Sequence, residues 1–136
     1  MFGFGIDKKQ VAHLAGIIHG LQLEFAKAVG ETALEQDRPL PAFCDANLAV
    51  IYGFASAGAD HMAVSDKVML RALETYFRSN FSDGPTLMLR QLRLCKDTAF
   101  SSMASTAVIA AEQVNRTGNL SAPMRFLATQ FIESVG

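Results

Sequence analysis

The chain has 136 residues, a net charge of −1 and two cysteines, and half of its residues are hydrophobic. A chain of this length forms one domain and buries enough surface for a core without disulfides or metals. The near-zero charge provides no field that attracts nucleic acid or anionic lipid, so both are poor candidate partners. Abundant alanine, without runs of β-branched residues, predicts an all-α fold in a single domain over residues 1–136.

The cysteines and the hydropathy pattern constrain the cellular location. Cys44 and Cys95 lack C-x-x-C spacing, which indicates two free thiols in a reducing compartment, and we expect the cytoplasm. The N-terminal segment has no basic stretch ahead of an apolar run, so we do not expect a secretory signal. No uncharged stretch reaches the ~20 apolar residues of a membrane span, so we expect none.

The N-terminal part of the chain combines an apolar arm with a first helix. The opening M-F-G-F-G-I alternates apolar residues with glycine, and we expect a flexible arm whose Phe2, Phe4 and Ile6 pack on the chain itself or on another chain. Asp7 is a good N-cap residue, and helical periodicity continues from it to about Gly30 or a little beyond. The apolar positions have the spacing of a packed helix and are Val11, Leu14, Ile18, Leu21, Phe25 and Ala28.

Two more helices are expected before residue 82. The R-P-L-P segment at 38–41 ends the preceding helix, because proline lacks an N–H donor and disfavours helix in the residue before it. The next helix is expected from Pro41 or Asp45 to Gly58. Another follows Ser65 as its N-cap, and its apolar side consists of Val68, Met69, Ala72, Leu73, Tyr76 and Phe77.

The helical pattern resumes at Pro85, after an S-D-G-P turn, and continues to Thr117–Gly118. One helix of that length is unusual in a small domain. Asp97 or Thr98 is suited to cap a new helix, so we expect a break near Asp97.

A last helix begins at Ser121 and tolerates Pro123 in its first turn. Its predicted buried residues are Met124, Leu127, Ala128, Phe131 and Val135. Together, the predicted elements make a compact bundle of five or six helices.

Residues 98–111 form the longest uncharged stretch and lie between Asp97 and Glu112. They are too few to span a bilayer, and several of them carry hydroxyl groups. We therefore expect a central helix, buried on most sides, whose hydroxyls bond to carbonyls one turn earlier.

Small residues cluster on several predicted helix faces, where they allow two backbones to approach closely. Gly16 and Gly20 form a G-x-x-x-G pattern away from the large apolar row of the first helix. A glycine inside a helix costs about 1 kcal/mol relative to alanine, so we expect a close crossing to compensate, either within the bundle or in a homodimer. The other small-residue positions are Ala46, Ala49, Gly53 and Ala57, and Ser101, Ser102, Ser105, Thr106, Ala107, Ala110 and Ala111.

Candidate catalytic and metal-binding residues are few. His13 and His19 lie on different faces of one helix, so they do not share a metal. His61 follows Asp60, and Cys44 lies near the start of a helix, so an enzyme that uses His61 or Cys44 remains an alternative. The sequence has no triad, paired-carboxylate or dinucleotide-binding pattern. We expect no cofactor and no metal.

A basic row, Arg90, Arg93 and Lys96, is a candidate anion patch. The preceding helix carries three more bases, and the patch forms if the two helices are antiparallel neighbours; these bases are Lys67, Arg71 and Arg78. A solvated helix face explains the same charges, because the aromatic and glycine residues typical of nucleic-acid surfaces are missing. We therefore expect no nucleic-acid partner.

The sequence thus predicts a small interaction or regulatory protein that acts through helix faces, as a homodimer, with a further protein partner also possible. The interface residues expected from the pattern are Phe2, Phe4, Ile6, Gly16 and Gly20. One alternative is a bundle that binds a small apolar molecule in a core lined by some of its ten phenylalanines and six methionines. The other is the enzyme considered above.

Overall fold

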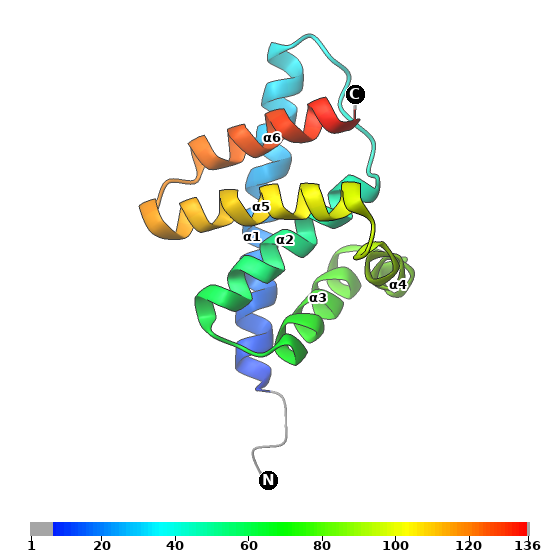
Figure 1. Cartoon of the computed structure of the whole chain (residues 1–136), viewed down its shortest axis with the longest axis vertical. Coiled ribbons are helices and arrows are strands. Elements are labelled where there is room, and N and C mark those ends of the chain that lie inside the picture. The colour runs from blue at the N-terminus through cyan, green and yellow to red at the C-terminus, as the bar shows by residue number, and fades with distance from the viewer. Residues whose placement is uncertain (1–6, 136) are drawn as a thin grey trace.

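The computed structural model describes residues 7–135, and these residues are helical apart from the connections between the helices. The six helices are α1 (Lys8–Glu35), α2 (Asp45–Met62), α3 (Asp66–Asn80), α4 (Gly84–Leu94), α5 (Thr98–Thr117) and α6 (Ser121–Val135). They pack into one bundle (Figure 1), which confirms the predicted all-α fold. The predicted apolar arm, with Phe2, Phe4 and Ile6, lies outside the described residues.

The helix ends follow local capping chemistry. The side chains of Asp7, Ser65 and Asp97 accept hydrogen bonds from backbone N–H groups in the first turns of α1, α3 and α5. The Asp97 cap separates α4 from α5, so the predicted break is confirmed. Gly118 ends α5 in the left-handed conformation, with φ of 74°.

The central helix is α2. It contacts each of the other five helices, and ten of its residues are buried. The first and last helices meet it at an aromatic cluster, where the ring of Phe25 lies edge-on to Phe131 at 5.2 Å and to Phe54 at 6.2 Å. The core extends over α1, α2, α3, α5 and α6, with α2 at its centre.

The expectation that residues 98–111 form a helix buried on most sides is wrong. α5 packs along α2 and beside α6, and its opposite face, with Ser101, Ser105 and Ile109, is exposed. Small hydroxyl residues are equally compatible with core and with solvent, so the absence of charge did not distinguish the two. The expected hydroxyl bonding does occur: Thr106 Oγ1 donates to the carbonyl oxygen of Ser102 at 3.0 Å.

A close crossing of small residues forms between α2 and α5. A Cβ placed on Gly53 would lie 2.5 Å from the carbonyl oxygen of Ala104 and 2.6 Å from the Cβ of Ala107. This confirms the prediction for these two helices. Gly16 and Gly20 are different: both are exposed, and an added Cβ would have no heavy atom within 4 Å. The internal crossing expected at these two glycines is therefore wrong, because this side of α1 faces away from the bundle.

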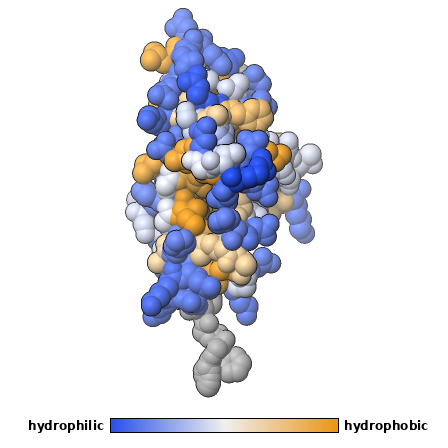
Figure 2. Space-filling model, turned by 90° about the vertical axis from the view of Figure 1, so that its left-hand side faces the viewer, coloured by the Kyte–Doolittle hydropathy of each residue, from blue (hydrophilic) through white to orange (hydrophobic). Residues whose placement is uncertain are grey.

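The face of the molecule shown in Figure 2 is mostly hydrophilic. On this face, apolar side chains form separate patches among hydrophilic ones. Among the described residues, no helix is both long enough and apolar enough to cross a bilayer. Of the residues predicted to be buried in α6, Met124, Leu127, Ala128 and Phe131 are buried, and Val135 is half-buried.

Candidate docking groove between α3 and α4

A groove of about 770 Å³ runs between α3 and α4 on the outside of the bundle. Its apolar floor consists of Leu70 from α3 and Met88, Leu89 and Leu92 from α4. Leu70, Leu89 and Leu92 are 38%, 57% and 44% exposed, which is unusual for three leucines gathered in one place. The remaining lining residues are Lys67, Arg71, Glu74, Arg78, Gly84 and Pro85.

The wall formed by α3 follows from its strongly amphipathic sequence. Its apolar residues at 68, 69, 72, 73, 76 and 77 are buried against the bundle. The charged residues therefore face outward along the groove. Tyr76 lies on the buried side, and burial raises its pKa to about 12.

The α4 side of the groove is apolar because none of the leucines of this helix, nor its methionine, is fully buried. Over its eleven residues, only Gly84 and Gln91 are buried. Gln91 is fully enclosed, and its Nε2 donates to the carbonyl oxygen of Leu48 at 3.1 Å. This bond holds α4 to α2, so the leucines on the other side of α4 stay on the groove.

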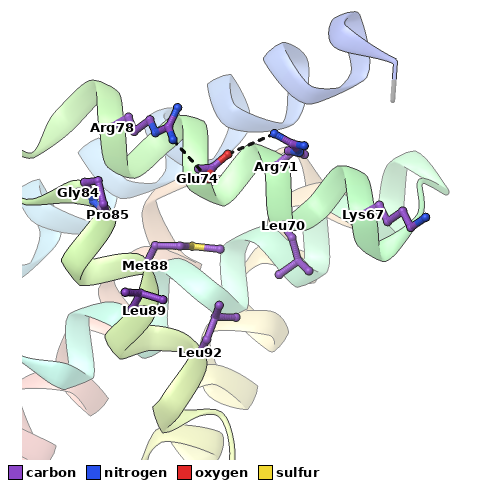
Figure 3. A pocket seen from close by; sticks show the side chains of 10 residues that line it. All are labelled: Lys67, Leu70, Arg71, Glu74, Arg78, Gly84, Pro85, Met88, Leu89 and Leu92. Atoms are coloured by element: carbon purple, nitrogen blue, oxygen red, sulfur yellow. Dashed lines mark ion pairs between the residues drawn. The ribbon is translucent and has the colours of Figure 1, made fainter. Parts of the chain in front are cut away.

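The closed end of the groove lies at Gly84. A Cβ on this residue would lie 2.5 Å from the carbonyl oxygen of Phe77, so only glycine permits α4 to begin so close to α3. Figure 3 shows the two helices diverging from this point, with Leu70, Met88 and Leu92 pointing into the space between them. The groove is thus a wedge that opens away from the short turn that joins α3 to α4.

The α3 wall is basic. Glu74 lies between Arg71 and Arg78, at N···O distances of 3.5 and 3.6 Å, as Figure 3 shows. Both ion pairs are long and exposed, and such pairs contribute roughly 0–1 kcal/mol, so the arginines readily exchange partners. Lys67, at the open end, makes no ion pair within residues 7–135. One carboxylate among three cations leaves this wall positive.

The predicted anion row does not lie in the groove. Arg90 faces α2 instead, and its Nε and Nη2 donate to the carboxylate oxygens of Asp45 at 2.6 and 2.8 Å. The hydrogen bond from Arg90 lowers the pKa of Asp45, and Asp45 in turn raises the pKa of Arg90. Arg93 and Lys96 are exposed and do not line the groove. The three bases noted on the preceding helix, Lys67, Arg71 and Arg78, are the ones that line it.

The predicted enzyme residues lie far apart. Cys44 caps the start of α2, where its backbone N–H donates to Asn47 Oδ1 at 2.9 Å. His61 is exposed near the other end of α2, beside a shallow hollow of about 430 Å³ that Glu112 and Arg116 also line. Along a helix, this separation is ~25 Å, so Cys44 and His61 do not act on one substrate. Residues 7–135 hold no group of three side chains suited to a metal ion.

Sequence reasoning missed the apolar half of the groove. None of its apolar residues was predicted as a site residue. The signal that could have found them is the distribution of apolar residues around α4, where Leu87, Met88, Leu89, Leu92 and Leu94 cannot share one face. A short helix that is apolar on several sides either lies deep in the core or carries an apolar surface, and α4 carries a surface.

The chain was compared with protein-family models, with curated proteins and with solved structures, and it matches none of them.

Proposed function

We propose that the protein is a protein-interaction module that captures an amphipathic helix of a partner in the α3–α4 groove. The observation that supports this proposal is the combination of one apolar floor with one basic wall in a groove between two helices. A helix laid into such a groove buries its apolar face on the floor. Burial of one leucine-sized side chain contributes about 1.5–3 kcal/mol, and several are needed to offset the loss of translational and rotational freedom.

The charges add selectivity to this proposal. A basic wall attracts an acidic partner and disfavours a basic one, which affects association rates more than final affinity. The regulatory role and the cytoplasmic location expected from the sequence belong to the same proposal. An apolar ligand in the core has less support, because the rings of Phe25, Phe54 and Phe131 pack against one another.

Peptide binding tests the proposal. The probe is a labelled synthetic helix with leucines along one face and glutamates beside them, and its binding is followed by fluorescence anisotropy. We expect Leu89→Glu to weaken binding at least tenfold, because it places a carboxylate on the groove floor. Ile109→Glu is the matched control: Ile109 is 52% exposed on α5, away from the groove. A peptide with lysines in place of the glutamates should bind more weakly.

Equal binding by the native chain, Leu89→Glu and Ile109→Glu would refute the groove as the site. Equal binding of the glutamate and lysine peptides would refute the role assigned to the basic wall.

A further inference from the structure

The spacing of the basic residues along α3 determines which spacing of acidic residues a helix bound in the groove needs. Lys67, Arg71 and Arg78 are separated by four and then seven residues. At ~1.5 Å per residue, these cations extend over ~16 Å, or about three helical turns. A helix that lies along this wall satisfies all three if it carries acids at intervals of four and seven, in an order that depends on its direction.

The C-terminal half of α1 carries such a row, on the side that borders the start of α6, where Glu24 and Glu31 line a hollow together with Leu120 and Met124. Glu24, Glu31 and Glu35 are separated by seven and then four residues, which is the spacing of the three bases read in reverse. Glu31 and Glu35 are exposed and Glu24 is half-buried. Glu35 Oε1 and Oε2 accept hydrogen bonds from Arg125 at 2.8 Å, and the other two acids make no ion pair within residues 7–135.

Beside these acids runs an apolar row that covers nothing in its own chain. Leu23 is 58% exposed and Leu34 is 82% exposed. Between them on the same side lies Gly30, where an added Cβ would have no heavy atom within 4 Å. In Figure 1, the C-terminal end of α1 projects beyond α6, away from α3 of its own chain. This part of α1 is therefore open to a second molecule.

We propose that the groove binds the α1 side that carries these acids and leucines from a second copy of this chain, with α1 antiparallel to α3. This inference rests on the function proposed above and names the partner. In the antiparallel register, the three acids meet the three bases, and Lys27, which follows Glu24, comes near Glu74. The resulting pairs are Glu24 with Arg78, Glu31 with Arg71, and Glu35 with Lys67.

The positions of the apolar rows agree with the same orientation. Each residue advances ~100° around a helix. Viewed down the axis of α1, the acids therefore lie ~90° around the helix from Leu23 and Leu34. Viewed down the axis of α3 in the same way, the bases lie at a similar angle from Leu70, and both displacements have the same rotational direction. When two such helices pack antiparallel, the charged row of one faces the charged row of the other, and the apolar rows also face each other. The α1 leucines therefore lie on the α4 side of the groove. Leu70 then lies between Gly30 and Leu34 of the second copy. A parallel docking places the leucines on the charged wall instead.

A charge exchange between two variants tests this contact. Arg71→Glu places a carboxylate opposite the partner's Glu31, and Glu31→Arg places a guanidinium opposite the partner's Arg71. Each variant alone should self-associate about tenfold more weakly than the native chain, as measured by sedimentation or light scattering over a concentration series. An equimolar mixture should regain native association, because in a mixed pair every groove again faces an opposite charge.

Two sets of variants keep the experiment decisive. Arg93→Glu and Glu112→Arg reverse exposed charges outside both surfaces and should associate as the native chain does. If either test variant fails to fold by circular dichroism, Arg78→Glu with Glu24→Arg examines the next pair in the register. Rising salt should weaken native self-association, because the paired charges are exposed.

Three results would overturn the inference. These are a chain that stays monomeric at concentrations up to about 1 mM, single variants that associate like the native chain, and a mixture that does not regain association. If the chain is monomeric but its groove binds the glutamate peptide and Leu89→Glu abolishes that binding, the proposed function stands and only the identity of the partner is wrong.

Discussion

Gly53 on α2 and Ala104 on α5 are in backbone contact: a Cβ on Gly53 would approach the Ala104 carbonyl oxygen to 2.5 Å. This crossing joins the central helix to the helix that covers it. Because the obstructing atom belongs to the backbone, a side chain at this position is accommodated only if the two helices move apart.

We expect Gly53→Ala to lower the free energy of unfolding by about 1–3 kcal/mol through overpacking. Alanine normally stabilises a helix relative to glycine, so a loss at this position is diagnostic of the crossing. Denaturant unfolding followed by circular dichroism measures it. Unchanged or increased stability would show that α2 and α5 are not in contact at Gly53.

The glycines on α1 should behave in the opposite way. Gly16→Ala and Gly20→Ala should each raise the free energy of unfolding by roughly 0.5–1 kcal/mol, because an added Cβ meets no atom and alanine is the better helix former. The same unfolding experiment, at a concentration where the chain is monomeric, serves as the matched control for Gly53→Ala. A loss of stability in either variant would reveal a neighbour on this face of α1.

Gly84→Ala should disturb the closed end of the groove. The added Cβ would meet the Phe77 carbonyl oxygen at 2.5 Å, so α4 must move away from α3. We expect a loss of about 1–3 kcal/mol together with weaker binding of the glutamate peptide. Thr86→Ala is the adjacent control, because Thr86 is exposed and does not line the groove. Native peptide affinity in folded Gly84→Ala would show that the groove does not depend on this close approach.

Substitutions at Gln91 test how α4 is held to α2. Its side chain is fully buried, and its Oε1 has no hydrogen-bond partner within the described residues. Gln91→Met should change stability by less than about 1.5 kcal/mol, because it removes an unpaired acceptor together with one hydrogen bond.

Gln91→Glu should be far more destabilising at pH 7, since it buries a carboxylate. Burial raises the folded-state pKa of such a group, so the loss develops as pH rises above the ordinary glutamate pKa of about 4.3 and disappears below it. A pH-independent loss in Gln91→Glu would contradict this account.

The buried Tyr76 should make the stability of the fold fall at alkaline pH. Burial raises its folded-state pKa to about 12, whereas the unfolded chain ionises near pH 10. Its contribution to stability is therefore complete below about pH 10 and lost as pH rises towards 12, by on the order of 2 kcal/mol. The difference in unfolding free energy between the native chain and Tyr76→Phe isolates this effect from that of Tyr52, whose pKa is also raised. If the unfolding free energies of the native chain and Tyr76→Phe change in the same way with pH, the pKa of Tyr76 is not raised in the folded state.

Much of the secondary structure was predictable from short stretches of sequence. Asp7, Ser65 and Asp97 each act on backbone groups within three residues, so a cap can be recognised without knowing the fold. The apolar row of α3 was also correct, because its hydrophobic periodicity reports directly on the buried side.

The candidate site was predictable only in part. Lys67, Arg71 and Arg78 were recognised as bases on one helix, but Arg90 was assigned to the same patch. Its actual partner, Asp45, is 45 residues away in the sequence, and no local pattern indicates that pairing. Gly16 and Gly20 show the same limitation, since a row of small residues does not reveal whether another helix lies against it.

The sequence by itself determined which stretches form helices and where most of them begin, because propensity and capping act within one or two turns. The end of α2 was predicted too early, since this helix continues past Gly58 to Met62. Only the tertiary structure decided which face of each helix is covered. That choice depends on close approaches between neighbouring helices, such as Gly53 with Ala104 and Gly84 with Phe77. The direction of α4 follows from one of these approaches and from the Gln91 bond to Leu48, and it is the direction of α4 that leaves an apolar groove open beside a basic wall.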